Sequence, residues 1–125
     1  MSTAYFIALE HPIPGLDTEM SGKHLAHSMK ELDAAARELG VKPLSEFFSA
    51  DPDDLAEQMD SADLAEIKLP PLEQFSAWEG LTTVRALLQH PVGQDEKIAY
   101  DLRDCERILS SAAHHRVNWH LELDI

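Results

Sequence analysis

Two histidines near the N-terminus have the spacing that a shared metal ion requires. His24 and His27 lie three residues apart, so on a helix both rings project from one side. A catalytic zinc site needs a third ligand, which His11 or His120 would have to supply from a strand. No recognised spacing links these four histidines, and an ordinary exposed helix face accounts for the pair more simply. We therefore predict no metal site and no cofactor, with His24 and His27 as the nearest candidates for ligands.

Groups that could act as nucleophiles are few. Cys105 is the single cysteine and falls on the apolar stripe of a predicted helix, where burial raises a thiol pKa and opposes reactivity. No serine occupies a nucleophile elbow, and the five glycines form no phosphate-binding loop. Asp101 and Asp104 are paired carboxylates, but three residues apart on a helix they are typical of a charged face. The sequence favours a non-enzymatic protein over an enzyme.

Acidic residues dominate the middle of the chain. The sequence has 23 Asp and Glu against 10 Lys and Arg, a formal net charge of −13, and residues 51–66 hold seven acids and no base. Such a run can steer a positive partner toward the protein, although acid runs also serve as plain solubilising surface. A tryptophan at the end of the run could pack onto the core or anchor an interface. The predicted partner-binding residues are Asp53, Asp54, Glu57, Asp60, Asp63 and Trp78.

The charge excludes several classes of partner. Binding to phosphate backbones requires Lys and Arg, so we expect neither nucleic acid nor an anionic membrane surface as a partner. No stretch approaches the roughly 20 apolar residues of a spanning helix. The lone cysteine fits a reducing compartment. A signal peptide would require a basic residue ahead of its apolar run, and the first Lys or Arg of this sequence is Lys23. We expect a cytoplasmic protein.

The N-terminal half contains one clear helical pattern. Residues 22–39 repeat apolar side chains every three or four positions. Ser21 is the predicted N-cap, and Gly40 is the predicted left-handed terminator. A second helix is expected to begin near Asp51, where a capping acid precedes a proline.

Two long helices are predicted in the C-terminal half. The first, residues 77–89, begins with a capping box in which the Ser76 side chain accepts from the Glu79 amide. The second, residues 95–115, carries a continuous apolar stripe. The short turn through residues 91–93 predicts that the two helices form an antiparallel hairpin.

The strands are predicted at the two ends of the chain. Residues 4–9 are apolar, which predicts a strand covered on both faces, and residues 117–124 alternate strictly between apolar and polar. The alternation places Trp119 on a buried face and His120 on a solvated one. The two segments are expected to pair, and residues 65–69 are a candidate third strand.

These elements predict one α+β domain over residues 1–125: a small two- or three-stranded sheet of N- and C-terminal strands with helices packed on one face. A two-stranded sheet is marginal in isolation, so we expect either the third strand or a homodimer that covers an edge. The residues expected to be largely buried are Leu25, Leu32, Leu88, Leu102, Cys105 and Trp119.

Two functions from different classes remain open on these observations. The favoured one is a non-enzymatic, acidic protein-interaction module that binds a basic partner, similar in charge and size to inhibitors and immunity proteins of basic toxins or nucleases. The alternative is a small metal- or ligand-binding enzyme that uses histidines and carboxylates. The first predicts an exposed acidic surface, and the second predicts a concave site that gathers several of the four histidines named above with an acid.

Overall fold

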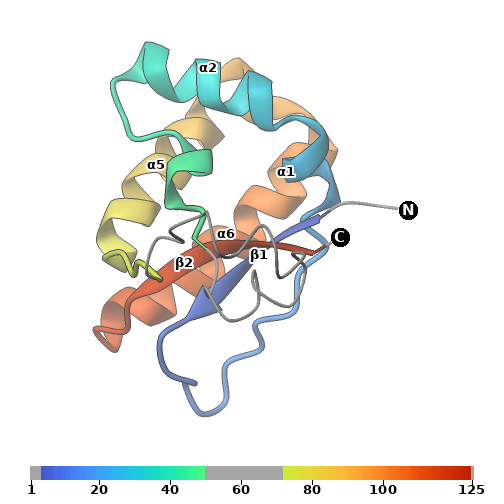
Figure 1. Cartoon of the computed structure of the whole chain (residues 1–125). Coiled ribbons are helices and arrows are strands. Elements are labelled where there is room, and N and C mark those ends of the chain that lie inside the picture. The colour runs from blue at the N-terminus through green and yellow to red at the C-terminus, as the bar shows by residue number, and fades with distance from the viewer. Residues whose placement is uncertain (1–3, 50–71, 125) are drawn as a thin grey trace, which may run out of the picture.

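The computed structural model describes residues 4–49 and 72–124, and it confirms the α+β architecture (Figure 1). Strands β1 (Ala4–Leu9) and β2 (Trp119–Asp124) form an antiparallel sheet, against which the helices pack. Between the strands lie four α-helices and two 3-10 helices of the described chain: α1 (Lys23–His27), α2 (Met29–Leu39), η1 (Leu44–Phe47), α5 (Ala77–Gln89), η2 (Pro91–Gln94) and α6 (Glu96–His114).

The predicted pairing of the two terminal strands is confirmed. Leu9 lies opposite Trp119, and Ile7 lies opposite Leu121. On the far side of β2, Trp119 exchanges two backbone hydrogen bonds with Phe75, at 2.7 and 2.9 Å. β2 therefore has backbone partners along both of its edges, and among the described residues β1 is an outer strand of the sheet.

The predicted helix over residues 22–39 is divided in two. The break falls at Ser28, which has φ −110° and ends α1 before α2 begins. The predicted N-cap Ser21 is wrong, because Gly22 holds that position with φ 63°. A Cβ there would lie 1.7 Å from the Tyr5 carbonyl oxygen, so contact with β1 selects glycine at the helix start.

The helical hairpin of α5 and α6 is confirmed, but the capping box at its start is wrong. Ser76 occupies the N-cap position of α5, yet its side chain makes no capping hydrogen bond. The Glu79 carboxylate instead lies 3.3 Å from the Lys42 ammonium, which draws it away from the helix start. At α6 the cap is Asp95, whose Oδ1 accepts from the amides of Lys97 and Ile98.

The core lies between the helices and the inner face of the sheet. The Trp119 indole is buried, stacks on Phe47 with ring centroids 4.8 Å apart, and donates from Nε1 to the Ser76 carbonyl. One predicted core residue is only half-buried: Leu88 sits beside the buried Leu87 on α5, about 100° further round the helix. The other five are buried as predicted: Leu25, Leu32, Leu102, Cys105 and Trp119.

Coverage of the sheet differs from the prediction on both strands. In β1 only Ile7 is fully buried, and its neighbours are half-buried. In β2 the alternation holds for Trp119 and Leu121, but His120 on the predicted solvated face is only 4% exposed. The His120 ring lies 3.1 Å from Gln74 Oε1, so a polar partner from a distant segment helps to cover it.

Two predicted elements, the helix start near residue 51 and the strand at residues 65–69, lie outside the described residues. Within residues 4–49 and 72–124, none of the helices combines the length and the apolarity needed to cross a bilayer.

Candidate functional site

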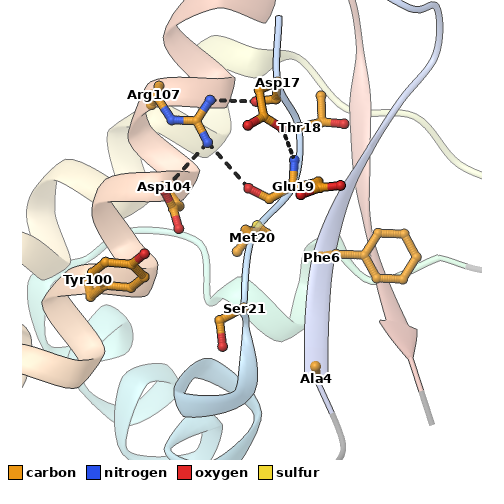
Figure 2. Close-up of a pocket in the computed structure, with 10 residues that line it drawn as sticks. All are labelled: Ala4, Phe6, Asp17, Thr18, Glu19, Met20, Ser21, Tyr100, Asp104 and Arg107. Atoms are coloured by element: carbon orange, nitrogen blue, oxygen red, sulfur yellow. Dashed lines mark hydrogen bonds and ion pairs between the residues drawn. The ribbon is translucent and has the colours of Figure 1, made fainter.

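A groove opens between the start of β1, the extended segment 17–21 and the middle of α6 (Figure 2). Its volume is about 700 Å³. Three stretches that are distant in sequence supply its walls: Ala4 and Phe6 from β1, Asp17 to Ser21 from the segment, and Tyr100, Asp104 and Arg107 from α6.

Arg107 connects two walls of the groove, segment 17–21 and α6. Its guanidinium donates to the backbone carbonyls of Asp17 and Glu19, and it lies 3.5 Å from Asp104 Oδ1 one turn earlier on α6 (Figure 2). A guanidinium presents several donors in a fixed fork, which suits contact with more than one acceptor. Arg107 therefore fastens segment 17–21 to the helix.

The groove is acidic around this single arginine. Asp17 and Glu19 are exposed, and the Asp17 carboxylate is partly used because Oδ1 accepts from the Glu19 amide at 2.9 Å. The Tyr100 ring is 62% exposed and lies one turn before Asp104 on α6. Carboxylates beside an exposed aromatic face can hold a cationic side chain, through ion pairing and through the ring quadrupole.

Asp101 has a role that the sequence did not reveal. It was predicted to share a charged face with Asp104, but it is fully buried, and Oδ2 accepts from the amides of His24 and Leu25 at 3.0 and 3.3 Å. Oδ1 is also buried and has no hydrogen-bond partner among the described residues. Asp101 on α6 thus caps α1. The sequence signal for its burial was its position four residues before Cys105, which places it on the apolar stripe of α6.

Cys105 is buried one turn after Asp101 on α6. Burial, and then the negative charges of Asp101 and Asp104, raise the pKa of the Cys105 thiol far above its usual range. A thiol that stays protonated is a poor nucleophile. The predicted assignment of Cys105 to the core is confirmed by its burial.

The histidines do not converge. His24 and His27 line one cavity of about 400 Å³ together with Asp95, but the Asp95 carboxylate already caps α6. His11 is exposed beside Glu10, and His120 lies on the sheet. Across the described ranges, no three His, Cys, Asp or Glu side chains are placed to hold a metal ion.

His120 forms its own polar cluster on the outer face of the sheet. Its Nε2 lies 2.9 Å from Glu122 Oε2, and its Nδ1 lies 3.1 Å from Gln74 Oε1. The three side chains tie the segment before α5 to β2. His120 is buried, Gln74 and Glu122 are half-buried, and none of the three lines the groove, so this cluster and the groove are separate features.

Among the predicted partner-binding residues, the structure places only Trp78. Its side chain is 62% exposed in the first turn of α5, where it lines a cavity of about 280 Å³ with Arg116 and Asn118. Trp78 does not line the groove, which is built on an earlier part of α6. The five predicted acids lie outside the described residues: Asp53, Asp54, Glu57, Asp60 and Asp63.

Comparison with known proteins adds no assignment: no protein-family model, curated protein or solved structure matches this chain.

Proposed function

We propose that this protein is a non-enzymatic interaction module that binds a basic protein partner through its acidic surface, in the manner of an inhibitor or immunity protein. The observation that supports the proposal is an excess of carboxylates, most of which form no ion pair with Lys or Arg among the described residues. The chain has a formal net charge of −13. In the part of the chain that the structure describes, only Glu79, Asp104 and Glu106 form ion pairs with Lys or Arg.

The exposed carboxylates are distributed over several elements, so the negative potential extends over much of the surface. Potentials of this kind raise the rate of encounter with an oppositely charged protein. The exposed acids of the described chain that make no such pair include Asp17, Glu19, Glu31, Glu46, Glu73 and Glu96.

The groove is the proposed contact point for one basic side chain of the partner. A Lys or Arg entering it would meet Glu19 and Asp104 as counter-ions and the Tyr100 ring as an apolar face. Asp104 Oδ1 already lies 3.5 Å from the Arg107 guanidinium, so an entering cation would share this carboxylate with Arg107, whereas Glu19 has no Lys or Arg partner among the described residues. Trp78 and the acidic run at residues 51–66 are proposed as further contacts.

The proposed location is the cytoplasm, because a single buried thiol suits a reducing compartment. A homodimer stays a prediction, and the charge of −13 on each copy opposes it.

The proposal is tested by identifying a partner and then measuring its kinetics. Proteins retained by the immobilised full chain at low salt and released at high salt would be purified, and their association and dissociation rates measured separately. Glu19→Gln with Asp104→Asn should slow association and speed dissociation. The matched control, Glu46→Gln with Glu73→Gln, removes the same charge outside the groove and should affect association only. A partner whose binding is indifferent to salt and to both pairs of substitutions would contradict the proposal.

A further inference from the structure

Helix α6 ends in a left-handed turn that contains an arginine. The Val117 amide donates to the Ala112 carbonyl at 2.8 Å, and the Arg116 amide donates to the Ala113 carbonyl at 3.2 Å. These two bonds define a Schellman motif, in which the residue after the C-cap adopts a positive φ. That residue is Arg116, with φ 56°. An arginine therefore occupies the position that glycine usually fills.

The backbone of Arg116 is strained in this conformation. A residue with a Cβ loses stability at positive φ, whereas glycine does not. The end of α2 has the usual residue, because its C-cap is Gly40 with φ 76°. Within the described residues, every other position with positive φ is a glycine: Gly15, Gly22 and Gly40. Since strain of this kind is retained where a side chain has a function, we looked for a role of the Arg116 guanidinium in binding.

The Arg116 side chain lines the cavity of about 280 Å³ between the start of α5 and the turn into β2. Three exposed side chains border this cavity: Trp78, Arg116 and Asn118. Buried apolar residues line it as well: Ala77, Ala113 and Val117. The cavity thus combines a guanidinium, a carboxamide and an indole with an apolar lining.

These groups are suited to a carboxylate that is attached to an apolar body. A guanidinium presents a planar fork of donors that matches the two oxygens of a carboxylate. The Asn118 Nδ2 lies 3.5 Å from Glu10 Oε1, and because an amide nitrogen carries two hydrogens, it can donate to a second acceptor. The Trp78 indole, 62% exposed, offers an apolar face for a hydrophobic side chain.

We propose that this cavity binds the C-terminal residue of a partner chain, with its carboxylate on Arg116 and an apolar side chain against Trp78. The small volume favours a single residue. Neighbouring side chains of an extended chain point to opposite sides, so an acidic side chain and the apolar one beside it would not enter together. At a chain end, one residue carries both groups. The site lies outside the groove and goes beyond the proposed function, so either can fail without the other.

The probe is a short peptide of Gly and Ser that ends in Leu with a free carboxylate, titrated into the full chain. Binding should shift the backbone amide resonances of Trp78, Arg116 and Asn118. The same peptide with a C-terminal amide should bind at least about tenfold more weakly, because the charge-assisted hydrogen bonds to the guanidinium are lost. Equal affinity of the two peptides, or no shift at these residues with the acid peptide, would overturn the inference.

A second peptide of equal charge separates a chain end from an acidic side chain. Its C-terminus is an amide, and a Glu immediately before the Leu supplies the carboxylate. This peptide should bind as weakly as the uncharged amide, since its carboxylate and its Leu side chain point to opposite sides. If it binds as tightly as the free acid, the assignment to a chain end is wrong.

Arg116→Gly tests the cavity with two measurements. The midpoint of urea denaturation should rise, because glycine relieves the left-handed strain, while the acid peptide should bind at least about tenfold more weakly. Arg103→Gln removes the same charge from an exposed position elsewhere on α6 and should leave peptide binding unchanged. A lower midpoint for Arg116→Gly would show that the fold itself requires the arginine, and unchanged peptide binding would show that the guanidinium is not used. Either result would overturn the inference.

Discussion

Gly80 of α5 lies directly against the indole ring of Trp119, so that a Cβ at position 80 would come within 2.4 Å of the indole Cζ2 and 2.9 Å of Nε1. A glycine inside a helix costs roughly 0.5–1 kcal/mol of stability relative to alanine. Glycine occupies position 80 because α5 approaches β2 closely there. This close approach lets the indole donate to the Ser76 carbonyl while it stacks on Phe47.

Gly80→Ala should therefore destabilise the protein despite its better helix propensity. We expect a loss of about 1–3 kcal/mol, since the indole must move out of its site or α5 must shift. Chemical denaturation followed by tryptophan fluorescence measures this loss. Thr82→Ala, on the exposed side of the same helix, is the control and should change stability by less than about 0.5 kcal/mol. Equal stability of Gly80→Ala and the parent would mean that the two elements are not in contact.

Trp119→Ala should remove the centre of the core. The expected cost is about 3–5 kcal/mol, as for other large-to-small substitutions of buried aromatic residues. Trp78→Ala is the matched control because Trp78 is exposed, and we expect less than about 0.5 kcal/mol from it. A similar cost for the two tryptophans in chemical melts would contradict the assigned burial.

Asp101→Ala should destabilise the attachment of α1 to α6. The change leaves the half-buried amide of His24 and the buried amide of Leu25 without their acceptor, a cost of about 1–3 kcal/mol. Asp101→Asn keeps one acceptor oxygen and should cost less. Hydrogen exchange of these two amides locates the effect, which should exceed any change in β2. Unchanged exchange in Asp101→Ala would show that the carboxylate does not cap the helix.

The raised pKa of the Cys105 thiol predicts how stability changes in alkali. Below the ordinary thiol pKa of about 8.5, the protonated thiol is compatible with burial and its contribution is fully present. Above it the unfolded chain releases a proton that the folded chain retains, so the free energy of unfolding should fall by up to about 1.4 kcal/mol per pH unit. Urea melts between about pH 8 and 9.5 measure the slope, which Cys105→Ala should reduce. A parent and a variant with the same slope would contradict burial of the thiol.

Substitutions in the acidic run at residues 51–66 test whether its charge contributes to partner binding or only to solubility. Asp54→Asn, Glu57→Gln and Asp60→Asn together should slow association with the partner and flatten its salt dependence, because such charges act on encounter. Stability should be unchanged or slightly higher, through relief of like-charge repulsion. If neither association nor stability responds, the run is a solubilising surface.

Much of the fold follows from local periodicity. The stripe of α6 and the alternation of β2 predicted both elements to within a residue or two, since each pattern reflects one buried face. The errors share a cause, which is contact between segments that are distant in the chain. Gly22 starts α1 because it meets Tyr5, and Asp101 is buried because it caps that helix.

The groove could not be predicted for the same reason. In the sequence, Arg107 has the pattern of an exposed basic residue on a helix, and Asp17 and Glu19 have the pattern of exposed acids in a loop. They are joined because the Arg107 guanidinium donates to the backbone carbonyls of Asp17 and Glu19, which lie 90 and 88 residues away in the chain. Backbone acceptors carry no sequence signature, so pattern analysis finds the acids and misses the site that they form.

The pairing of β1 with β2 has a consequence for synthesis on the ribosome. Leu9 leaves the exit tunnel long before Trp119, its partner in the sheet. At a translation rate of about 5–20 residues per second, β1 waits roughly 5–20 s for the strand that completes it. The helices can form during that interval, but the core cannot close until the indole arrives. For that time the apolar segment that becomes β1 has been synthesised without its sheet partner, and its burial depends on the last residues of the chain.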